Sequence, residues 1–193
     1  GYVANWNSVD GQPGAHCFYV AGDNSTVENN YCTDVNGLGL QIYHSSATPI
    51  NNTVRYNVFK NTTKTGLLCG YGSGHKCYNN IMVDNSTGLA VRGNSQVYNN
   101  TIYSPSGDGI VINDASASVR NNLIDSESGT AVNNAASASD VANNYTGAPG
   151  FINAGSDNFN LDTGSGAIDG CVAITGFSEG RYVGSAPDCG ALE

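Results

Sequence analysis

A short element that ends in asparagine recurs six times along the chain at nearly constant spacing. It begins with valine or cysteine and lies at 27–30, 54–57, 77–80, 97–100, 119–122 and 141–144, so that its closing asparagines are 27, 23, 20, 22 and 22 residues apart. A second element, a glycine followed mainly by apolar residues, alternates with it at 39–42, 66–69, 88–91, 109–112 and 129–132. Two markers that share one period indicate a chain built from repeated structural units.

The pattern inside each repeat is that of short strands. Apolar residues alternate with polar ones over short runs separated by Gly, Asn, Ser and Asp, and no apolar stripe of helical period is sustained. Three short strands in about 22 residues are typical of one coil, or rung, of a parallel β-helix, whose rungs stack about 4.8 Å apart. We predict an all-β fold, a single β-helix of about six to seven short rungs. The rungs are expected over 15–162, between a lead-in at 1–14 and a capping segment at 163–193.

In such a stack, residues one repeat apart become vertical neighbours, so the sequence also predicts the core. Four internal columns are expected, each made of apolar side chains from successive rungs. They are Leu40, Leu67, Leu89 and Ile110; Ile42, Cys69, Val91, Ile112 and Val132; Val27, Val54, Cys77, Val97, Val119 and Val141; and Phe59, Met82, Ile102 and Ile124.

The closing asparagines of the repeat form a further column. They are Asn30, Asn57, Asn80, Asn100, Asn122 and Asn144. We expect each of them to adopt the left-handed backbone conformation that a tight turn between two sheets requires, because asparagine tolerates it better than other non-glycine residues. We also expect their side chains to hydrogen-bond along the column as an asparagine ladder.

The charge balance and the hydropathy exclude some classes of partner. The chain has 7 Lys and Arg residues against 16 Asp and Glu residues, a formal net charge of −9. Nucleic acids and anionic membrane surfaces are bound through clustered cations, so we expect neither as a partner. No apolar run approaches the roughly 18 residues that a membrane-spanning helix needs, and we expect no membrane insertion.

Six cysteines in this acidic chain favour disulfides and an oxidising compartment, so we expect a secreted or cell-surface protein. The chain begins at Gly1 without a leader, which we interpret as processing. Neighbouring cysteines are the candidate pairs: Cys69 with Cys77 in one rung, Cys17 with Cys32 in the first rung, and Cys171 with Cys189 around the last segment. The connectivity stays open at this point, because six cysteines can pair in many ways.

The C-terminal part carries four motifs: Pro-Gly-Phe-Ile-Asn at 149–153, Asp-Asn-Phe-Asn-Leu at 157–161, Gly-Ser-Gly-Ala-Ile-Asp at 164–169 and Asp-Cys-Gly-Ala-Leu-Glu at 188–193. With the repeat, this ending resembles the bacterial right-handed parallel β-helix repeat proteins of the pectate-lyase-like superfamily, and in particular their secreted and surface-anchored members. Gly166 and Cys189 depart from that family's pattern, which has Pro and Ile there. The resemblance implies a right-handed helix. The N-terminal cap typical of the family is missing, so we expect either that the chain is trimmed or that its first rung, near 16–34, is left open.

In enzymes of this superfamily the substrate lies along the outside of one sheet, so outward residues are the candidates for chemistry. A lyase acting on a uronic-acid polymer must neutralise a carboxylate and remove the proton next to it, which requires a cation or calcium and a base. Arg92, His75, Lys76 and Tyr43 offer these groups and are the candidate catalytic residues. No complete signature of a pectate lyase, polygalacturonase or epimerase is present. Acidic residues at 34–37 and 108–109 give only part of a calcium loop, so we expect no metal or cofactor, with calcium as the alternative.

A second outward column follows the recurring valine, and consists of Glu28, Arg55, Tyr78, Tyr98 and Arg120. Tyrosines between guanidinium groups can support a sheet through cation–π and cross-strand contacts. They can also offer aromatic faces on which a sugar ring stacks. Tyr78, Tyr98, Arg55 and Arg120 are therefore the candidate carbohydrate-binding residues.

Three functions remain open at the level of the sequence. The first is a non-catalytic extracellular or cell-surface β-helix module, a scaffold that binds a polysaccharide. The second is a polysaccharide lyase-like enzyme centred on Arg92. The third is a self-assembling filament subunit that stacks head to tail, because open ends of a β-helix present unpaired strand edges.

Overall fold

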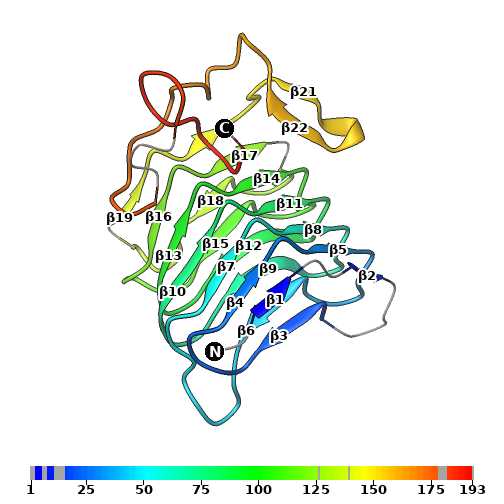
Figure 1. Cartoon of the computed structure of the whole chain (residues 1–193), viewed down its shortest axis with the longest axis vertical. Coiled ribbons are helices and arrows are strands. Elements are labelled where there is room, and N and C mark those ends of the chain that lie inside the picture. The colour runs from blue at the N-terminus through cyan, green and yellow to red at the C-terminus, as the bar shows by residue number, and fades with distance from the viewer. Residues whose placement is uncertain are drawn as a thin grey trace.

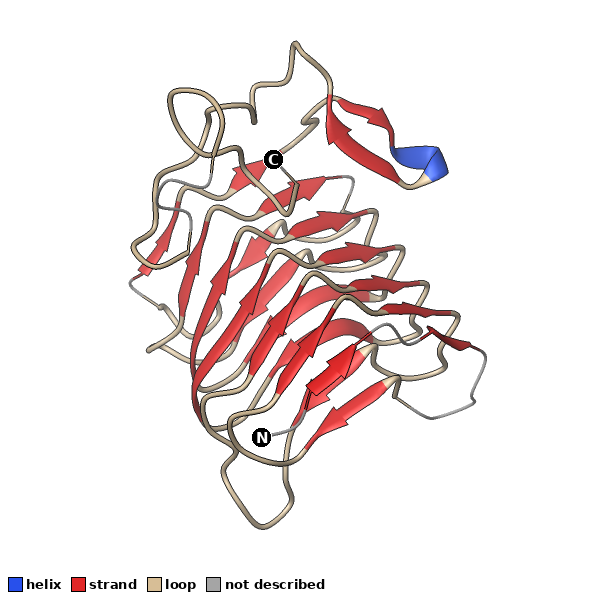
Figure 2. Cartoon of the chain, viewed as in Figure 1, coloured by secondary structure: helices blue, strands red, loops and turns tan. Residues whose placement is uncertain are grey.

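The computed structural model describes residues 16–125, 127–138, 140–177 and 182–192, together with the backbone of two short strands at 3–5 and 8–10. Within them, three parallel sheets run the length of the molecule and wind around one core (Figures 1 and 2). Sheet A contains β1 (Val3–Asn5), β4 (Thr26–Glu28), β7 (Thr53–Arg55), β10 (Ser73–Tyr78), β13 (Asn94–Tyr98), β16 (Ser118–Arg120) and β19 (Asp140–Ala142), in that order.

Sheets B and C are built in the same way. Sheet B contains β2 (Ser8–Asp10), β5 (Tyr31–Thr33), β8 (Val58–Lys60), β11 (Ile81–Val83), β14 (Thr101–Tyr103), β17 (Leu123–Asp125) and β20 (Tyr145–Thr146). Sheet C contains β3 (Phe18–Val20), β6 (Leu40–Ile42), β9 (Thr65–Cys69), β12 (Thr87–Val91), β15 (Ile110–Ile112) and β18 (Val132–Asn133). Each strand therefore pairs with the strand one repeat away, and the predicted solenoid is confirmed.

The predicted core columns are confirmed as well. Val97 lies opposite Val119 in sheet A, Leu67 opposite Leu89 in sheet C, and neighbouring rungs repeat this register. The side chains of all four columns are buried in one apolar cluster, apart from Val132 and Val141 in the last rung, which are half-buried. Period-2 alternation places one residue of each short strand inside and its neighbours outside, which is why the sequence pattern was enough to assign them.

The asparagine ladder forms from Asn30 to Asn144. From Asn30 to Asn122, each side-chain amide donates to the Oδ1 of the asparagine in the next rung, at 2.9–3.0 Å. That oxygen also accepts the backbone N–H of the preceding asparagine, at 3.0–3.1 Å. The ladder thus satisfies buried polar groups that a turn inside a core would otherwise leave unpaired.

The expected left-handed conformation lies one residue earlier than predicted. The residues with positive φ are those just before the ladder: Asn29, Tyr56, Asn79, Asn99, Asn121 and Asn143, with φ between 51° and 59°. The ladder asparagine itself must aim its amide into the stack, so the chain reverses at the preceding residue. The second asparagine of the repeat thus makes the hydrogen bonds, and the first makes the turn.

The three neighbouring cysteine pairs are disulfides. Cys17–Cys32, Cys69–Cys77 and Cys171–Cys189 have Cα–Cα distances of 6.2, 6.3 and 5.2 Å. The first two lie within single rungs. The third closes the C-terminal segment over a small second apolar cluster with Leu123 and Ala167.

The ends of the solenoid differ from the predicted boundaries. β1 and β2, inside the expected lead-in, pair in parallel with β4 and β5, so two sheets already begin there. After β20 the chain leaves the rungs, because β21 (Phe151–Asn153) and β22 (Asn158–Leu161) form an antiparallel hairpin around the 3-10 turn η1 (Ala154–Ser156). The C-terminal residues, orange and red in Figure 1, gather at this end of the stack. A second copy would have to meet this end in head-to-tail association, which stays a prediction.

The described residues include no helix with the length and apolar character of a membrane span.

Candidate functional site

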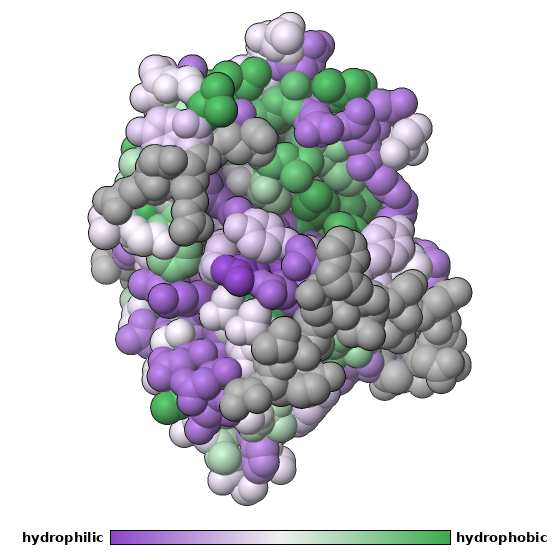
Figure 3. All heavy atoms as spheres, in the orientation of Figure 1, coloured by the Kyte–Doolittle hydropathy of each residue, from purple (hydrophilic) through white to green (hydrophobic). Residues whose placement is uncertain are grey.

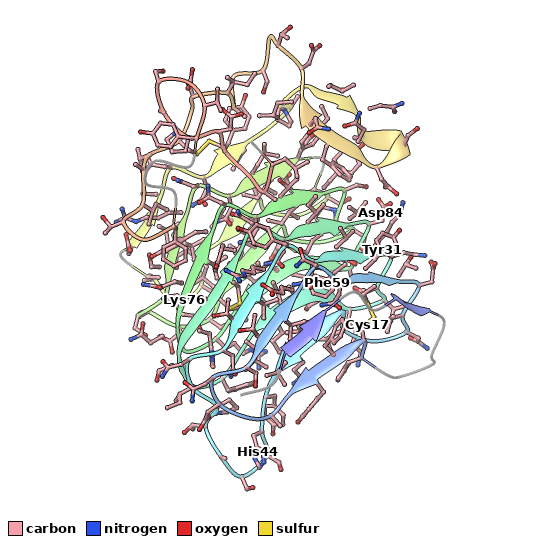
Figure 4. All side chains as sticks on the ribbon, in the orientation of Figure 1. Cys17, Tyr31, His44, Phe59, Lys76 and Asp84 are labelled. Carbon is pink, nitrogen blue, oxygen red and sulfur yellow. A yellow bond between two sulfur atoms is a disulfide. The ribbon has the colours of Figure 1, made fainter. Side chains whose placement is uncertain are left out.

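The four candidate catalytic residues do not converge. Tyr43 and Arg92 lie at the ends of β6 and β12 in sheet C, whereas Lys76 points outward from β10 in sheet A (Figure 4). The Lys76 ammonium lies 5.5 Å from the centre of the Phe177 ring. His75 is wholly buried, with a relative exposure of 0%. The expected constellation of Arg92, His75, Lys76 and Tyr43 is therefore not assembled at one surface.

The burial of His75 has a simple cause. Counting back from Cys77, which is inside, Lys76 faces outward and His75 inward, and a bulge between Ser73 and His75 fits the extra residue into the rung. Burial lowers the pKa of His75. The imidazole is thus part of the core of the rung and makes no contact with solvent.

The residues of the candidate carbohydrate-binding column stack along the outer face of sheet A, and Phe177 from the C-terminal segment packs against two of them. Tyr78 and Tyr98 lie opposite each other on β10 and β13. The Phe177 ring meets both edge to face, with centroid distances of 5.1 and 4.8 Å. Tyr98 is only 5% exposed as a result.

The arginines of the same column are also engaged. Arg55 donates to Glu28 at 2.6 Å and to the Tyr78 hydroxyl at 2.9 Å. Arg120 forms an ion pair with Asp140. Phe177 and Asp140 were not foreseen, because neither belongs to the recurring element that defines the column. The tyrosines and arginines of this column are therefore engaged with other residues of the chain, and carbohydrate binding there stays a prediction.

Part of sheet B is covered in the same way. Tyr103 on β14 packs against Phe151 and Phe159 of the β21–β22 hairpin, with centroid distances of 5.9 and 5.5 Å. Lys60 on β8 forms an ion pair with Asp157 of the hairpin at 2.6 Å. Figure 3 shows apolar residues gathered toward this end of the visible face. Exposed apolar side chains of the C-terminal segment include Ile152, Val172 and Val183.

The outer face of sheet C carries an aromatic row in which Tyr19 and Tyr71 are exposed. The rings of Tyr19, Tyr43 and Tyr71 follow one another across three rungs, with centroid distances of 6.2 and 5.2 Å. The Arg92 guanidinium continues the row 5.2 Å from the Tyr71 centroid, and donates a hydrogen bond to the Tyr71 hydroxyl. His16 stacks on Tyr19 at the other end of the row.

Two hollows adjoin this row and share Tyr71 and Arg92. The first has a volume of about 350 Å³ and is lined mainly by Gln41, Tyr43, Lys64, Leu68, Tyr71 and Arg92. The second, of about 520 Å³, is lined by Thr48, Tyr71, Gly72, Arg92, Asn113 and Asp114. Hydrogen bonds from the Ser116 hydroxyl and backbone N–H hold the pKa of Asp114 below its usual value. Together the hollows form a shallow groove along sheet C.

The groove also holds two cations without ion-pair partners. Among the described lysines and arginines, Arg55, Lys60 and Arg120 are paired with carboxylates and Lys76 lies over Phe177. Lys64 and Arg92 form no ion pair, are exposed, and line the same hollow. The sequence named Arg92 and Tyr43 but missed Tyr71 and Lys64. Tyr71 was missed because the repeat aligns Cys69 with Val91, and therefore aligns Gly70, and not Tyr71, with Arg92 of the next rung.

No metal centre is assembled in the part of the chain that the structure describes, where no three His, Cys, Asp or Glu side chains are grouped to hold an ion. Asp34 accepts hydrogen bonds from Thr33 and Asn61, and Asp108 from Asn133 and the Thr130 backbone. These carboxylates fix turns.

The comparison with known proteins identifies the fold family. A family model described as right-handed β-helix region matches residues 5–146. The chain belongs to the right-handed β-helix family. No curated protein matches the sequence. The match ends where the β-helix rungs end, so the hairpin and the segment carrying Phe177 lie outside the family region. In this β-helix protein, the groove on sheet C lies on the family scaffold itself.

Proposed function

We propose that this β-helix is an extracellular or cell-surface scaffold that binds an acidic polysaccharide along the outer face of sheet C. The observation that carries the proposal is that the outer face of sheet C differs from those of sheets A and B, both in what packs on it and in its cations, which are unpaired among the described residues. The aromatic columns of sheets A and B are packed against the C-terminal segment, whereas the row of Tyr19, Tyr43 and Tyr71 is open and ends at Arg92. The three disulfides support an oxidising compartment.

The aromatic row suits a linear polymer of sugars. Its rings lie 5–6 Å apart along the stack, a step comparable to the length of one sugar residue. Successive rings are steeply inclined to one another, at 85° and 68°, so the row offers both faces and edges. Tyrosine contributes a large apolar face and a hydroxyl that can hydrogen-bond to a sugar.

The charges of the groove favour an acidic ligand. The chain has a net charge of −9, which repels polyanions over most of the surface. Lys64 and Arg92 are available to a carboxylate because neither is already paired, and a guanidinium can bind a carboxylate through two parallel hydrogen bonds. The carboxylates of an acidic polymer would therefore meet positive charge in the hollow lined by Lys64 and Arg92, whereas the other hollow holds Asp114 beside Arg92.

Calorimetric titration with polygalacturonate, and with the same polymer after methyl esterification, tests the proposal. We expect binding of the acidic polymer, weaker binding of the neutral ester, and about a tenfold loss of affinity in Arg92→Gln, which corresponds to about 1.4 kcal/mol. Lys76→Gln is the matched control, because it removes one positive charge from sheet A and should leave the affinity unchanged. Absence of binding to any acidic polymer, or equal losses in both variants, would overturn the proposal.

A polysaccharide lyase remains the second candidate, because the Arg92 guanidinium and the Tyr71 hydroxyl are hydrogen-bonded in the groove. These are a cation and a phenol, two groups that elimination next to a uronate carboxylate can use. Ultraviolet absorbance of an unsaturated product would report the reaction. Tyr71→Phe separates the two functions, since it should abolish such product while keeping most of the binding.

A further inference from the structure

The turn that carries Tyr71 is anchored from inside the core by His75. Residues 70–74 lie between Cys69 and Cys77, whose disulfide closes the turn. Gly72 and Gly74 have positive φ values of 106° and 71°. The turn is tightly packed, because a Cβ on Gly72 would lie 1.8 Å from the Pro49 carbonyl oxygen and 3.2 Å from the His75 imidazole. Tyr71, by contrast, is 38% exposed and lines the groove.

The hydrogen bonds of His75 define its protonation state. The backbone N–H of Asn52 points at Nδ1, at 3.2 Å, so Nδ1 must be the acceptor. Nε2 lies 2.8 Å from the carbonyl oxygen of Tyr71 and must be the donor. A neutral imidazole with its proton on Nε2 satisfies both partners. A protonated imidazole would direct a second N–H at the N–H of Asn52, and would place a charge in the core.

We propose that His75 is a positioning residue for Tyr71, and that its protonation loosens the Tyr71 turn and weakens the groove on sheet C as the pH falls. The proposal rests on the function proposed above for its ligand, but the coupling between His75 and Tyr71 stands on the two hydrogen bonds alone. Loss of the bond to the Asn52 N–H would tilt the imidazole and release the Tyr71 carbonyl. The Tyr71 ring, which meets Tyr43 edge to face and lies under the Arg92 guanidinium, would then lose its fixed place.

The groups around His75 determine the direction of the effect. Burial lowers its pKa, and the carbonyls of Tyr71 and Pro49 and the charge of Asp23 partly oppose this. The next rung presents Ser95, an uncharged and buried hydroxyl with no hydrogen-bond partner. The folded state favours the neutral imidazole over the imidazolium. The stability that this preference contributes is therefore fully present above the unfolded pKa of about 6.5, and is lost as the pH falls below that value toward the lower pKa of the folded state.

The neighbouring rung supplies a design for the test. At the position of His75 the preceding rung has Asn52, whose Oδ1 accepts the Ser25 N–H at 2.8 Å and whose amide donates to the Gly22 carbonyl at 2.9 Å. Asparagine thus fills this column without titrating. His75→Asn should keep the acceptor for the Asn52 N–H, lose the bond to the Tyr71 carbonyl and remove the titration.

The experiment follows the Tyr71 ring and the His75 imidazole by NMR from about pH 8 down to about pH 4, because an unperturbed histidine changes charge between about pH 5 and 8 and burial lowers the pKa of His75. In the wild type we expect the Tyr71 resonances, assigned with Tyr71→Phe, to move with the titration of His75, and polygalacturonate affinity to fall about tenfold over the same range. In His75→Asn the Tyr71 resonances should be independent of pH, and the affinity at neutral pH should already be reduced. His44→Asn, on an exposed loop (Figure 4), should behave as the wild type.

The possible results support or overturn the coupling between His75 and Tyr71. Tyr71 resonances that stay fixed while His75 titrates, or an unchanged pH response in His75→Asn, would overturn the inference. Protonation of His16, beside Tyr19, would strengthen binding of a polyanion, which is the opposite sign. If no acidic polymer binds at any pH, the proposed function fails, and the Tyr71 resonances still test the coupling.

If His75→Asn does not fold, amide exchange in the wild type replaces it. Protection of the Asn52 N–H should then fall on acidification relative to that of the Ser25 N–H, whose acceptor does not titrate.

Discussion

The outer faces of sheets A and C are built from the same materials and differ in what covers them. Each carries tyrosines next to arginine on successive rungs. On sheet A, Phe177 lies against Tyr78 and Tyr98, and both arginines are paired with carboxylates. On sheet C, Tyr71 is 38% exposed and Arg92 has no ion-pair partner among the residues that the structure describes. The repeat alone therefore does not decide whether an aromatic column supports the fold or faces a ligand.

The difference between the two faces comes from the non-repeating part of the chain. Every rung must stack, so the repeated positions report on packing. The covering of a face comes from the non-repeating C-terminal segment, which packs against sheets A and B and is closed by the Cys171–Cys189 disulfide. Residues that bind a partner should be sought on the face that this segment leaves bare.

The largest expected effect compares one tyrosine from each face. Tyr98→Ala removes a ring that is 5% exposed, packs against Phe177 and hydrogen-bonds to Ser118 at 2.7 Å. Truncation of a buried aromatic side chain costs about 3 kcal/mol, so we expect a clear loss in the free energy of unfolding, measured with urea. Tyr71→Ala removes an exposed ring and should cost less than about 1 kcal/mol, while reducing polymer affinity.

The two variants control each other. Equal effects on stability would show that both columns are structural, and equal effects on binding would show that the coverage of sheet A does not matter. Either result would remove the contrast between the two faces.

A smaller effect is expected when the cover itself is changed. Phe177→Ala removes two edge-to-face contacts, each worth about 0.5–1.5 kcal/mol, and because Phe177 is only half-buried we expect the lower part of their sum, a loss of about 1–2 kcal/mol in the free energy of unfolding. Tyr98 should then become reactive to tyrosine acetylation, which mass spectrometry detects. Val172→Ala, which truncates a side chain that is 41% exposed in the same segment, is the matched control. Unchanged reactivity of Tyr98 would mean that Phe177 does not protect it.

Much of this molecule follows from its repeat, and the exceptions have physical reasons. Leu67 and Val97 could be assigned to the core because alternation and period fix their place. The left-handed residue was expected one position too late, because two adjacent asparagines share the work of turning and hydrogen bonding. His75 was expected at the surface, although alternation counted back from Cys77 places it inside. Phe177 could not be placed, because a contact between a non-repeating segment and a sheet leaves no periodic signal.

The smallest expected effect separates backbone strain from ring contacts on the covered face. Tyr56 has a φ of 57° at a turn where the other five rungs have asparagine. Its ring contacts Tyr78 at a centroid distance of 6.1 Å and lies 5.6 Å from the Arg55 guanidinium. A left-handed conformation costs a residue other than glycine or asparagine about 1–2 kcal/mol, whereas contacts of a 42% exposed ring contribute less. We therefore expect Tyr56→Asn to raise the free energy of unfolding by about 0.5 kcal/mol.

The reverse substitution in the next rung, Asn79→Tyr, places tyrosine at a φ of 54° and should be destabilising by a larger amount, because it adds strain without an evolved set of ring contacts. Urea midpoints of the two variants and the wild type measure both effects on one scale. A loss of stability in Tyr56→Asn would mean that the aromatic contacts around Tyr78 outweigh the strain of the turn. The contacts of exposed residues such as Tyr56 would then stabilise the covered face in addition to the buried ring of Tyr98.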